Sequence, residues 1–473
     1  MRREELQPAL ELAAREAAHY LAGVDERPVR SQRVEEALEA FGGSLPEQGD
    51  GALAALAELA GEGFEGAVHS AGPRFFHFVT GGVTPAALGA DWLASTIDQM
   101  AGVWVAGPSA ARLETVAIEW LKELFGLPEL FGGVLTTGAT MANFVGLAAG
   151  RQWWGERHGR DLAEDGFAGL PAVPVFSSGY LHASARKALA MLGIGRGSVV
   201  TFERDAAGRL DAEALEDALR RLDGAPALLV GNAGEVNAGD FDPLARLADL
   251  AERHRAWFHV DGAFGLFARL APAAAHLLEG VERADSVTAD GHKWLNVPYD
   301  CGFAFVREPA ALPGIFALDA AYLPPPGDPR PNYGFAGPEA SRRGRSLAVW
   351  ATLKAYGRAG YREMVERHLE LARRLARRVD EAPDLERLAE VPLNIVLFRY
   401  RPPGVPEEEL DELNARLGED VLVDGRVYVG TTRVAGRTAF RPAIVNWRTG
   451  EEDVDLLVDV LRELGATLLA RTK

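Results

Sequence analysis

Short β-rich runs alternate with helical stretches between residues 133 and 306, and this alternation limits the fold more than any other feature. The expected strands are Gly133–Thr137, Val173–Ser177, Ser198–Phe202, Ala227–Asn232, Trp257–Asp261, Ser286–Ala289 and Gly302–Val306. Helical patterns lie between several of them, at Ala139–Arg151, Ala183–Leu192, Asp211–Arg221 and Leu244–His254. This order predicts an α/β fold with a mostly parallel sheet covered by helices on both faces. Ligands of such sheets bind at the carboxyl ends of the strands.

The regions before and after this alternation have different sequence patterns. Residues 1–75 are expected to form an N-terminal helical segment, residues 76–355 a large α/β domain and residues 356–473 a small α+β domain. The Pro/Gly-rich segment from Leu323 to Pro338 predicts a mobile loop. The later expected elements are a helix at Ser346–Asp380, strands at Asn394–Arg399, Arg426–Thr431 and Ala439–Val445, and helices at Glu407–Leu417 and Glu452–Leu464.

Charge and cysteine content exclude several classes of function. The chain of 473 residues carries 68 acidic and 50 basic residues, a net charge of −18, and such a surface repels nucleic acid. Cys301 is the single cysteine, so we expect no intrachain disulfide and no cysteine-based zinc site. His254 and His259 lack a third ligand, so no metal site is expected. Neither a signal-peptide pattern nor an apolar run of about 18 residues is present, which favours a cytoplasmic protein without a membrane partner.

Two charged residues near strand ends are candidates for a catalytic or cofactor-binding role. Lys293 follows the strand that ends near Ala289 and lies between His292 and Trp294. A lysine is usually a solvated surface group, but these neighbours suit a partly desolvated, reactive amine. Asp261 ends a buried-type strand. It either caps the following turn or holds the protonated ring nitrogen of a cofactor.

Two further groups stand at other strand ends. The small residues Gly138, Ala139 and Thr140 join a strand to a helix, and they predict either an anion cradle or an ordinary helix cap. His182 follows the strand at Val173–Ser177 and is placed to stack on a planar ring, although a lone histidine usually has no such role. Anion cradle, histidine, aspartate and lysine are the groups that pyridoxal 5′-phosphate (PLP) requires for its phosphate, ring face, ring nitrogen and aldehyde.

From about residue 73 to residue 449, the sequence resembles the PLP-dependent group II amino-acid decarboxylases. This family includes aromatic-L-amino-acid, glutamate, histidine and cysteine-sulfinate decarboxylases. The most specific stretches are His259-Val260-Asp261-Gly262-Ala263, His292-Lys293-Trp294 with Asp300-Cys301, Gly234 to Asp242, and Ser341 to Leu347. The resemblance implies the aspartate-aminotransferase-like fold, PLP fold type I, and PLP as the cofactor.

The resemblance also implies roles for individual residues. Lys293 matches the Schiff-base lysine, Asp261 the partner of the pyridine nitrogen, and His182 the stacking imidazole. The other cofactor-binding positions that it implies are Gly138, Ala139, Thr140, Asn237 at the ring hydroxyl, Ala263 beneath the ring, Asp290 where many members have Asn, the catalytic His292, and Ser341. Ser341 matches a residue that reaches the phosphate of the neighbouring subunit, which implies a homodimer with a shared active site.

Tyr322 matches the family's catalytic tyrosine, which protonates the carbon after carbon dioxide leaves. Alternatively, Tyr322 is a tyrosine of the hydrophobic core without a catalytic role. Relatives with phenylalanine there form aldehydes, so Tyr322 favours plain decarboxylation of an L-amino acid, expected to be aromatic, to its amine. The implied substrate wall comprises His77, Phe78, Trp104 and Tyr299, and Gly102 is expected to leave room for a larger or different substrate.

Three other functions remain open at this point. An aminotransferase of the same fold would share the cofactor site and use a C-terminal arginine such as Arg441 for the substrate carboxylate. A decarboxylating aldehyde synthase would also share the site. A non-catalytic protein that binds the cofactor is the third alternative.

Overall fold

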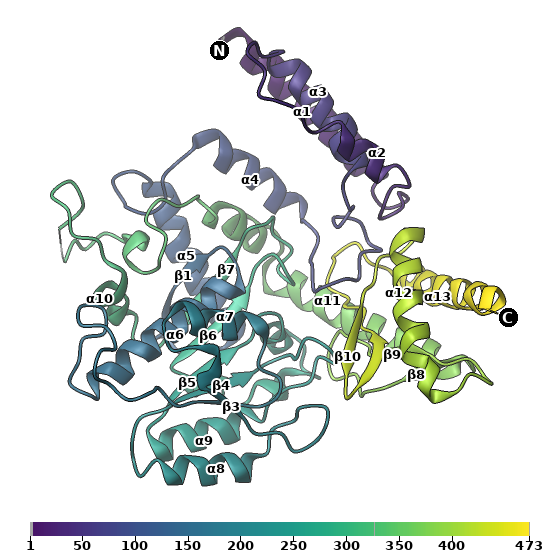
Figure 1. Cartoon of the computed structure of the whole chain (residues 1–473). Helices are drawn as coiled ribbons and strands as arrows, with labels where there is room; N and C mark the ends of the chain where they lie inside the picture. Colours follow the sequence, from purple (N-terminus) through teal and green to yellow (C-terminus); the bar gives the residue numbers. More distant parts are fainter. Residues whose placement is uncertain (1–2, 326, 473) are drawn as a thin grey trace. The chain divides into compact units, whose positions relative to one another are not determined.

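In the computed structural model, residues 3–325 and 327–472 are described, and the chain divides into two compact units. The smaller unit takes the chain as far as Gly82, Arg373–Ala389 and the chain from Val396 onward. The larger unit takes Val83–Ala372 and Glu390–Ile395 (Figure 1). The N-terminal helices and the C-terminal sheet therefore belong to one unit, although they are far apart in sequence.

The described residues of the larger unit form a seven-stranded sheet in the order β1-β7-β6-β5-β4-β2-β3. Its strands are β1 (Gly132–Thr136), β2 (Val175–Ser177), β3 (Val199–Thr201), β4 (Leu228–Asn232), β5 (Trp257–Asp261), β6 (Ser286–Asp290) and β7 (Gly302–Val306). The strand β7 runs antiparallel to both of its neighbours, and the pairs among β2 to β6 are parallel. The expected α/β fold with a mostly parallel sheet is confirmed.

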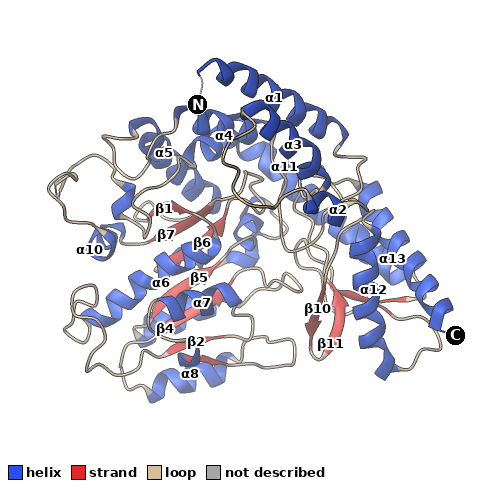
Figure 2. Ribbon diagram, turned by 45° about the horizontal axis from the view of Figure 1, so that its top comes forward, coloured by secondary structure: helices blue, strands red, loops and turns tan. Residues whose placement is uncertain are grey.

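Helices cover this sheet along its length (Figure 2). They are α4 (Pro85–Ile97), α5 (Pro108–Phe125), α6 (Ala139–Glu156), α7 (Ala183–Met191), α8 (Ala212–Arg221), α9 (Leu244–His254), α10 (Leu312–Phe316) and α11 (Ser346–Glu381), which continues into the smaller unit. The helix α11 is broken at Gly357, which has φ 60° and ψ −174°. Short 3-10 helices occur at Arg3–Glu5, Arg196–Ser198, Gly265–Leu270, Ala275–Leu278, Val281–Arg283, Pro309–Ala311, Tyr333–Phe335 and Glu407–Glu409.

Helix α6 packs closely on strand β5 because it presents glycines to that strand. A Cβ atom at Gly146 would lie 2.8 Å from Cε1 of His259, and one at Gly150 would lie 2.8 Å from Cδ1 of Trp257. Alternate residues of a strand share a face, and helix residues three to four apart share a side. Gly146 and Gly150 therefore lie on one side of α6, opposite His259 and Trp257 on one face of β5. All four residues are buried in the core.

The smaller unit contains helices and an antiparallel four-stranded sheet within its described residues, in the order β10-β11-β9-β8. The helices are α1 (Leu6–Gly23), α2 (Val34–Glu39), α3 (Ala52–Glu65), α12 (Leu410–Asp424) and α13 (Glu451–Thr472). The strands are β8 (Leu385–Arg387), β9 (Phe398–Tyr400), β10 (Thr431–Val434) and β11 (Arg437–Phe440).

The strand positions expected in this unit were wrong by several residues. The structure places β10 and β11 on either side of a two-residue turn, in which Ala435 has φ 49° and Gly436 has φ 78°. Two successive positive φ angles suit the twist of a hairpin, but alanine is not a turn signal and so the turn was missed. The expected strand at Arg426–Thr431 is mostly loop, and the short strand β8 was not expected.

The Pro/Gly-rich segment contains no strand among its described residues, and its one helical element is the short 3-10 helix at Tyr333–Phe335. Pro326 of that segment lies outside the described residues. Within the described part of the chain, no helix combines the length and the apolar character that a membrane span requires.

The contact between α6 and β5 predicts an effect on stability. Gly150→Ala places a methyl group against the buried Trp257 ring, so we expect a loss of about 1–3 kcal/mol in the free energy of unfolding. The control is Gly89→Ala in α4, where a Cβ would meet no atom within 4 Å and better helix propensity adds up to about 1 kcal/mol. Urea denaturation of both variants measures the difference, and a Gly150→Ala protein as stable as wild type would contradict the packing.

Candidate active site

Several of the expected site residues meet at the carboxyl ends of the parallel strands. Asp261 and Asp290 end β5 and β6, Lys293 follows β6, and His182 precedes α7. A narrow cavity at this edge is lined by Tyr180, His182, Asn232, Gly234, Glu235, Val236, Asp261, Ala263, Phe264 and Lys293. The structure therefore brings together the lysine, the aspartate, the histidine and the small residue that the sequence singled out separately.

Asp261 presents a fixed carboxylate to this cavity. Its Oδ1 accepts a hydrogen bond of 3.2 Å from the backbone N–H of Ala263, and its Oδ2 accepts one of 2.8 Å from Nδ2 of Asn143. An ionised carboxylate offers about four lone-pair sites, so it can still accept a further N–H from a ring nitrogen. The side chain is buried, which strengthens such a charged hydrogen bond.

Lys293 and His292 both lie close to the carboxylate of Asp290. Nζ of Lys293 is 3.8 Å from Oδ2 of Asp290 and 5.8 Å from the centre of the Phe264 ring. Nε2 of His292 is 3.2 Å from Oδ1 of Asp290, and Nδ1 of His292 accepts the backbone N–H of Cys301 at 3.1 Å. Because Nδ1 accepts, the proton of neutral His292 is on Nε2, and the nearby Oδ1 of Asp290 accepts no hydrogen bond from the described residues.

The turn between β1 and α6 has the form of an anion cradle. Gly138 has φ 142° and ψ 177°, a conformation essentially restricted to glycine, and a Cβ there would lie 2.9 Å from Cε1 of His292. Ala139 and Thr140 begin α6, whose N-terminus carries partial positive charge. The backbone N–H of Ala139 donates to Oδ2 of Asp290 at 3.1 Å, so this carboxylate lies at the cradle itself.

His182 caps α7 and keeps an exposed ring. Its Nδ1 accepts the backbone N–H of Ser184 at 3.2 Å and lies 2.7 Å from Oγ of Ser184. These contacts hold one edge of the ring, and His182 lines the cavity.

Of the expected catalytic and cofactor-binding residues, His182, Asp261, Ala263 and Lys293 line the cavity, whereas eight described ones do not: Gly138, Ala139, Thr140, Asn237, Asp290, His292, Tyr322 and Ser341. Asn237 lies beside the wall, where its backbone N–H and its side-chain amide both donate to Oε1 of Glu235. Tyr322 is 86% exposed on the loop after α10, and Ser341 is exposed before α11. Sequence reasoning gave no individual role to the other lining residues, which are Tyr180, Asn232, Gly234, Glu235, Val236 and Phe264, or to Asn143. Most of them lie in the turns that follow strands, whereas Asn232 and Asn143 lie inside β4 and α6, where a polar residue carries no separate signal.

The expected substrate-wall residues fall in both units. In the smaller unit, the rings of His77 and Phe78 are 3.8 Å apart, and the carbonyl of Phe78 accepts a hydrogen bond from Arg441 at 2.6 Å. Burial, together with the positive charge of Arg441, lowers the pKa of His77 to about 4. In the larger unit, the backbone N–H of Trp104 donates to Oδ1 of Asn332 at 2.9 Å.

Tyr299 and Gly102 complete this set. The Tyr299 ring is 58% exposed and stacks on His292, with centroids 4.1 Å apart. The expectation that Gly102 leaves open space was wrong, because a Cβ there would lie 1.9 Å from the carbonyl oxygen of Ala340. Gly102 instead allows the segment before Ser341 to approach closely.

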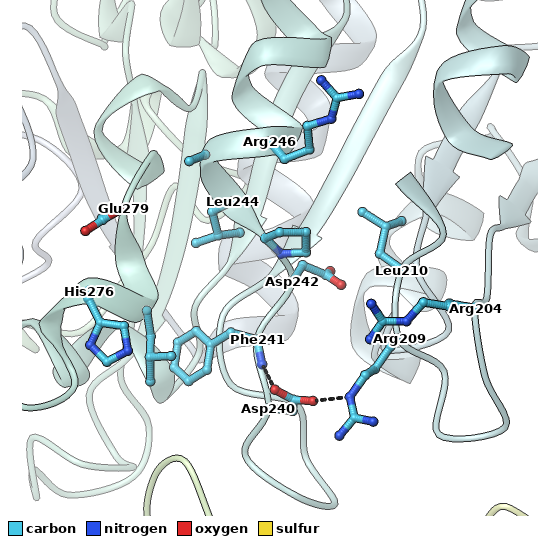
Figure 3. A pocket seen from close by; sticks show the side chains of 13 residues that line it. Arg204, Arg209, Leu210, Asp240, Phe241, Asp242, Leu244, Arg246, His276 and Glu279 are labelled. Atoms are coloured by element: carbon cyan, nitrogen blue, oxygen red, sulfur yellow. Dashed lines mark hydrogen bonds and ion pairs between the residues drawn. The ribbon is translucent and has the colours of Figure 1, made fainter. Parts of the chain in front are cut away.

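A larger hollow of about 540 Å³ lies elsewhere on the larger unit. Figure 3 shows the side chains that line it. Its arginines are already paired, since Arg209 binds Asp240 and Arg246 binds Glu216. Among the described residues, none of the expected site residues lines this hollow. The groups with reactive chemistry are at the narrower cavity.

Comparison with known proteins identifies the family. The model of the Pyridoxal-dependent decarboxylase conserved domain matches residues 39–401. The chain belongs to this family. As a pyridoxal-dependent decarboxylase, it is an amino-acid lyase with PLP as its cofactor.

The similarity to individual relatives extends over most of the chain of this decarboxylase. An aromatic-L-amino-acid decarboxylase of Bacillus atrophaeus is 31% identical over 418 residues, which cover 87% of this chain and 85% of that protein. A phenylacetaldehyde synthase of Petunia hybrida is 27% identical and covers 96% of this chain and 92% of its own. The crystal structure of Oryza sativa TDC with PLP and tryptamine has a TM-score of 0.90 at 26% identity and covers 99% of both chains. The expected fold type I architecture is confirmed.

The groups at the cavity fit PLP. Lys293 offers an amine, the carboxylate of Asp261 has lone pairs for a ring N–H, and the start of α6 offers a positive end for a phosphate. The tight approach at Gly138 leaves no room for a Cβ beside His292.

The cradle predicts a loss of cofactor affinity in Gly138→Ala. The added Cβ demands a backbone conformation that alanine rarely adopts and pushes on His292, so we expect PLP to bind at least about tenfold more weakly. Gly166→Ala is the control, because Gly166 also has a positive φ, of 64°, but has open space around it. Fluorescence titration of the apoproteins with PLP measures both, and unchanged affinity in Gly138→Ala would contradict the cradle.

Proposed function

We propose that this decarboxylase acts on an aromatic L-amino acid and releases the corresponding amine and carbon dioxide. The observation that carries the proposal is the grouping of Lys293, Asp261, His182 and Ala263 around one cavity. The similarity to an aromatic-L-amino-acid decarboxylase and to a structure containing tryptamine supports the aromatic class. The expected wall residues of the larger unit, Trp104 and Tyr299, supply rings suited to an aromatic side chain.

Each side chain has a defined task in this proposal. When bound, PLP supplies an electron sink for the bond to the departing carboxylate. Lys293 would hold the cofactor through its amine. Asp261 would accept the ring N–H and favour the charged form of that nitrogen. His182 and Ala263, which line the same cavity, would hold the ring in place.

The remaining residues orient the phosphate and the ring edge. Gly138, Ala139 and Thr140 bind the phosphate at the start of α6, where the helix dipole favours an anion. Asp290 and His292 lie beside this end of the site. We assign Asn237 to the ring hydroxyl. In this structure, its side-chain amide donates a hydrogen bond to Glu235.

Two proposed roles involve mobile or partner segments. Tyr322 delivers a proton to the carbon that has lost its carboxylate. This role requires the loop that carries the exposed Tyr322 to close over the substrate. Ser341 reaches the phosphate of a neighbouring subunit, so the active form is a homodimer with shared sites. The exposure of Ser341 in the single chain is consistent with such a role.

A decarboxylating aldehyde synthase is the second candidate, because the chain is similar to the phenylacetaldehyde synthase of Petunia hybrida. The two functions differ in the fate of the carbon after carbon dioxide leaves. A proton donor at that carbon yields the amine, and its absence leaves the carbon open to oxygen. Tyr322 favours the amine.

The substrate class is tested by turnover with a panel of amino acids. We expect tryptophan, tyrosine or phenylalanine to give the highest kcat/KM for release of carbon dioxide, and we expect Lys293→Ala to release none. Chromatography identifies the amine. A clear preference for glutamate or 2,4-diaminobutyrate would overturn the aromatic assignment and leave the decarboxylase family untouched.

The role of Tyr322 is tested by the product ratio in Tyr322→Phe. This change keeps the ring and removes the proton donor, so we expect the amine yield to fall at least about tenfold while aldehyde and ammonia rise. Tyr356→Phe, at a half-exposed tyrosine of α11, is the control and should keep the wild-type ratio. If Tyr322→Phe gives the same products at the same rate, Tyr322 has no part in the chemistry.

A further inference from the structure

Asn143 lies on α6 with its side chain fully buried against β5. Its Nδ2 donates to Oδ2 of Asp261 at 2.8 Å and to Oγ of Ser184 at 3.3 Å. Its Oδ1 is 2.9 Å from Nε2 of His259. Both amide hydrogens and the carbonyl oxygen of this one side chain are therefore in use.

The orientation of the Asn143 amide follows from the chemistry of its neighbours. An ionised carboxylate only accepts hydrogen bonds, so the NH₂ group faces Asp261 and the carbonyl faces His259. Nε2 of His259 must then donate, and its Nδ1 accepts from the hydroxyl of Ser286 at 2.8 Å. His259 is neutral in this arrangement, in agreement with its full burial, which lowers its pKa to about 4.

The chain of donors continues beyond His259. Nε1 of Trp257 donates to Oγ of Ser286 at 3.1 Å. The hydroxyl hydrogen of Ser286 has two acceptors within reach, the carbonyl oxygen of Gly146 at 3.3 Å and Nδ1 of His259 at 2.8 Å, and the shorter contact assigns it to His259. Trp257 and His259 are alternate residues of β5 and face the same helix. Every hydrogen bond along the path from Trp257 to Asp261 thus points toward the carboxylate, and successive bonds of this kind strengthen one another.

A second branch leads from Asn143 to His182. Because Oγ of Ser184 accepts from Asn143, its own hydrogen is directed to Nδ1 of His182 at 2.7 Å. That nitrogen also accepts the backbone N–H of Ser184. Nδ1 of His182 therefore carries no proton, and one asparagine constrains both residues assigned to the ring.

We propose that Asn143 is a positioning residue that holds Asp261 and His182 for the cofactor ring, and that His259 sets the direction of the Asn143 amide. The inference rests on the proposed roles of Asp261 and His182. Without the Nε2–H of His259, the amide can turn and place its oxygen against the Asp261 carboxylate. The carboxylate then loses its best-aligned donor and its fixed direction toward the ring nitrogen.

The test compares two cofactors that differ only at the ring nitrogen. Apoprotein is titrated with PLP and with the analogue in which carbon replaces that nitrogen, for wild type, Asn143→Ala, His259→Phe and His259→Gln. We expect Asn143→Ala and His259→Phe to weaken PLP binding about tenfold or more and the analogue less than about threefold. His259→Gln keeps an amide N–H donor and should recover most of the PLP affinity.

Two control variants distinguish a failure of the positioning role of Asn143 from a failure of the proposed role of Asp261. Asn414→Ala removes a buried amide that bonds Tyr400 and Leu410 in the smaller unit, and it should weaken neither cofactor selectively. Asp261→Asn should show the same selectivity as Asn143→Ala. Selectivity in Asp261→Asn but an equal loss for both cofactors in Asn143→Ala would overturn the positioning role. No selectivity in Asp261→Asn would instead refute the proposed function of Asp261.

A measurement on the unaltered protein keeps the proposal testable if a variant does not fold. Nitrogen-15 NMR of labelled histidine distinguishes the two neutral tautomers from the charged ring. We expect His259 to be neutral with its proton on Nε2 between about pH 6 and 8. A proton on Nδ1 or on both nitrogens in that range would overturn the directed chain.

Discussion

The hydrogen bond from Asn143 to Asp261 joins helix α6 to strand β5, and the geometry of the site depends on this contact. It forms because α6 lies unusually close to the sheet, which its glycines at 146 and 150 allow. The same helix begins at Gly138, so one element carries both the proposed phosphate cradle and the asparagine behind the proposed partner of the ring nitrogen. A change in the packing of α6 would therefore move both ends of the cofactor site together.

A buried ion pair holds the strand that leads into this helix. Glu114 and Arg342 are 2.9 Å apart with almost no exposed surface, and both bond the backbone of Leu135 in β1. Burial raises the pKa of Glu114, while the charge of Arg342 opposes that rise. Arg342 follows Ser341, so the pair ties the proposed partner-reaching segment to the strand before Gly138. Loss of either partner leaves a buried charge, which costs far more than the pair contributes.

The sequence predicted the parts of this molecule that depend on local pattern. The alternation of strands and helices located the large sheet, and strand ends located Asp261, Lys293 and His182. The network behind them was not predicted, because Asn143 and Ser286 are polar residues inside regular elements and have no pattern of their own. Their roles depend on which helix faces which strand. The prediction of open space beside Gly102 was wrong for the same reason, because its neighbour Ala340 is more than two hundred residues away in sequence.

The proposed function depends most on Lys293 as the residue that would bind PLP covalently. The most direct measurement is borohydride reduction of the PLP-loaded protein, followed by proteolysis and mass spectrometry of the labelled peptide. We expect one labelled position, Lys293, within the peptide that contains Gly291-His292-Lys293-Trp294. Stoichiometric label on Lys122, Lys187, Lys354 or Lys473, or no label on Lys293, would contradict it.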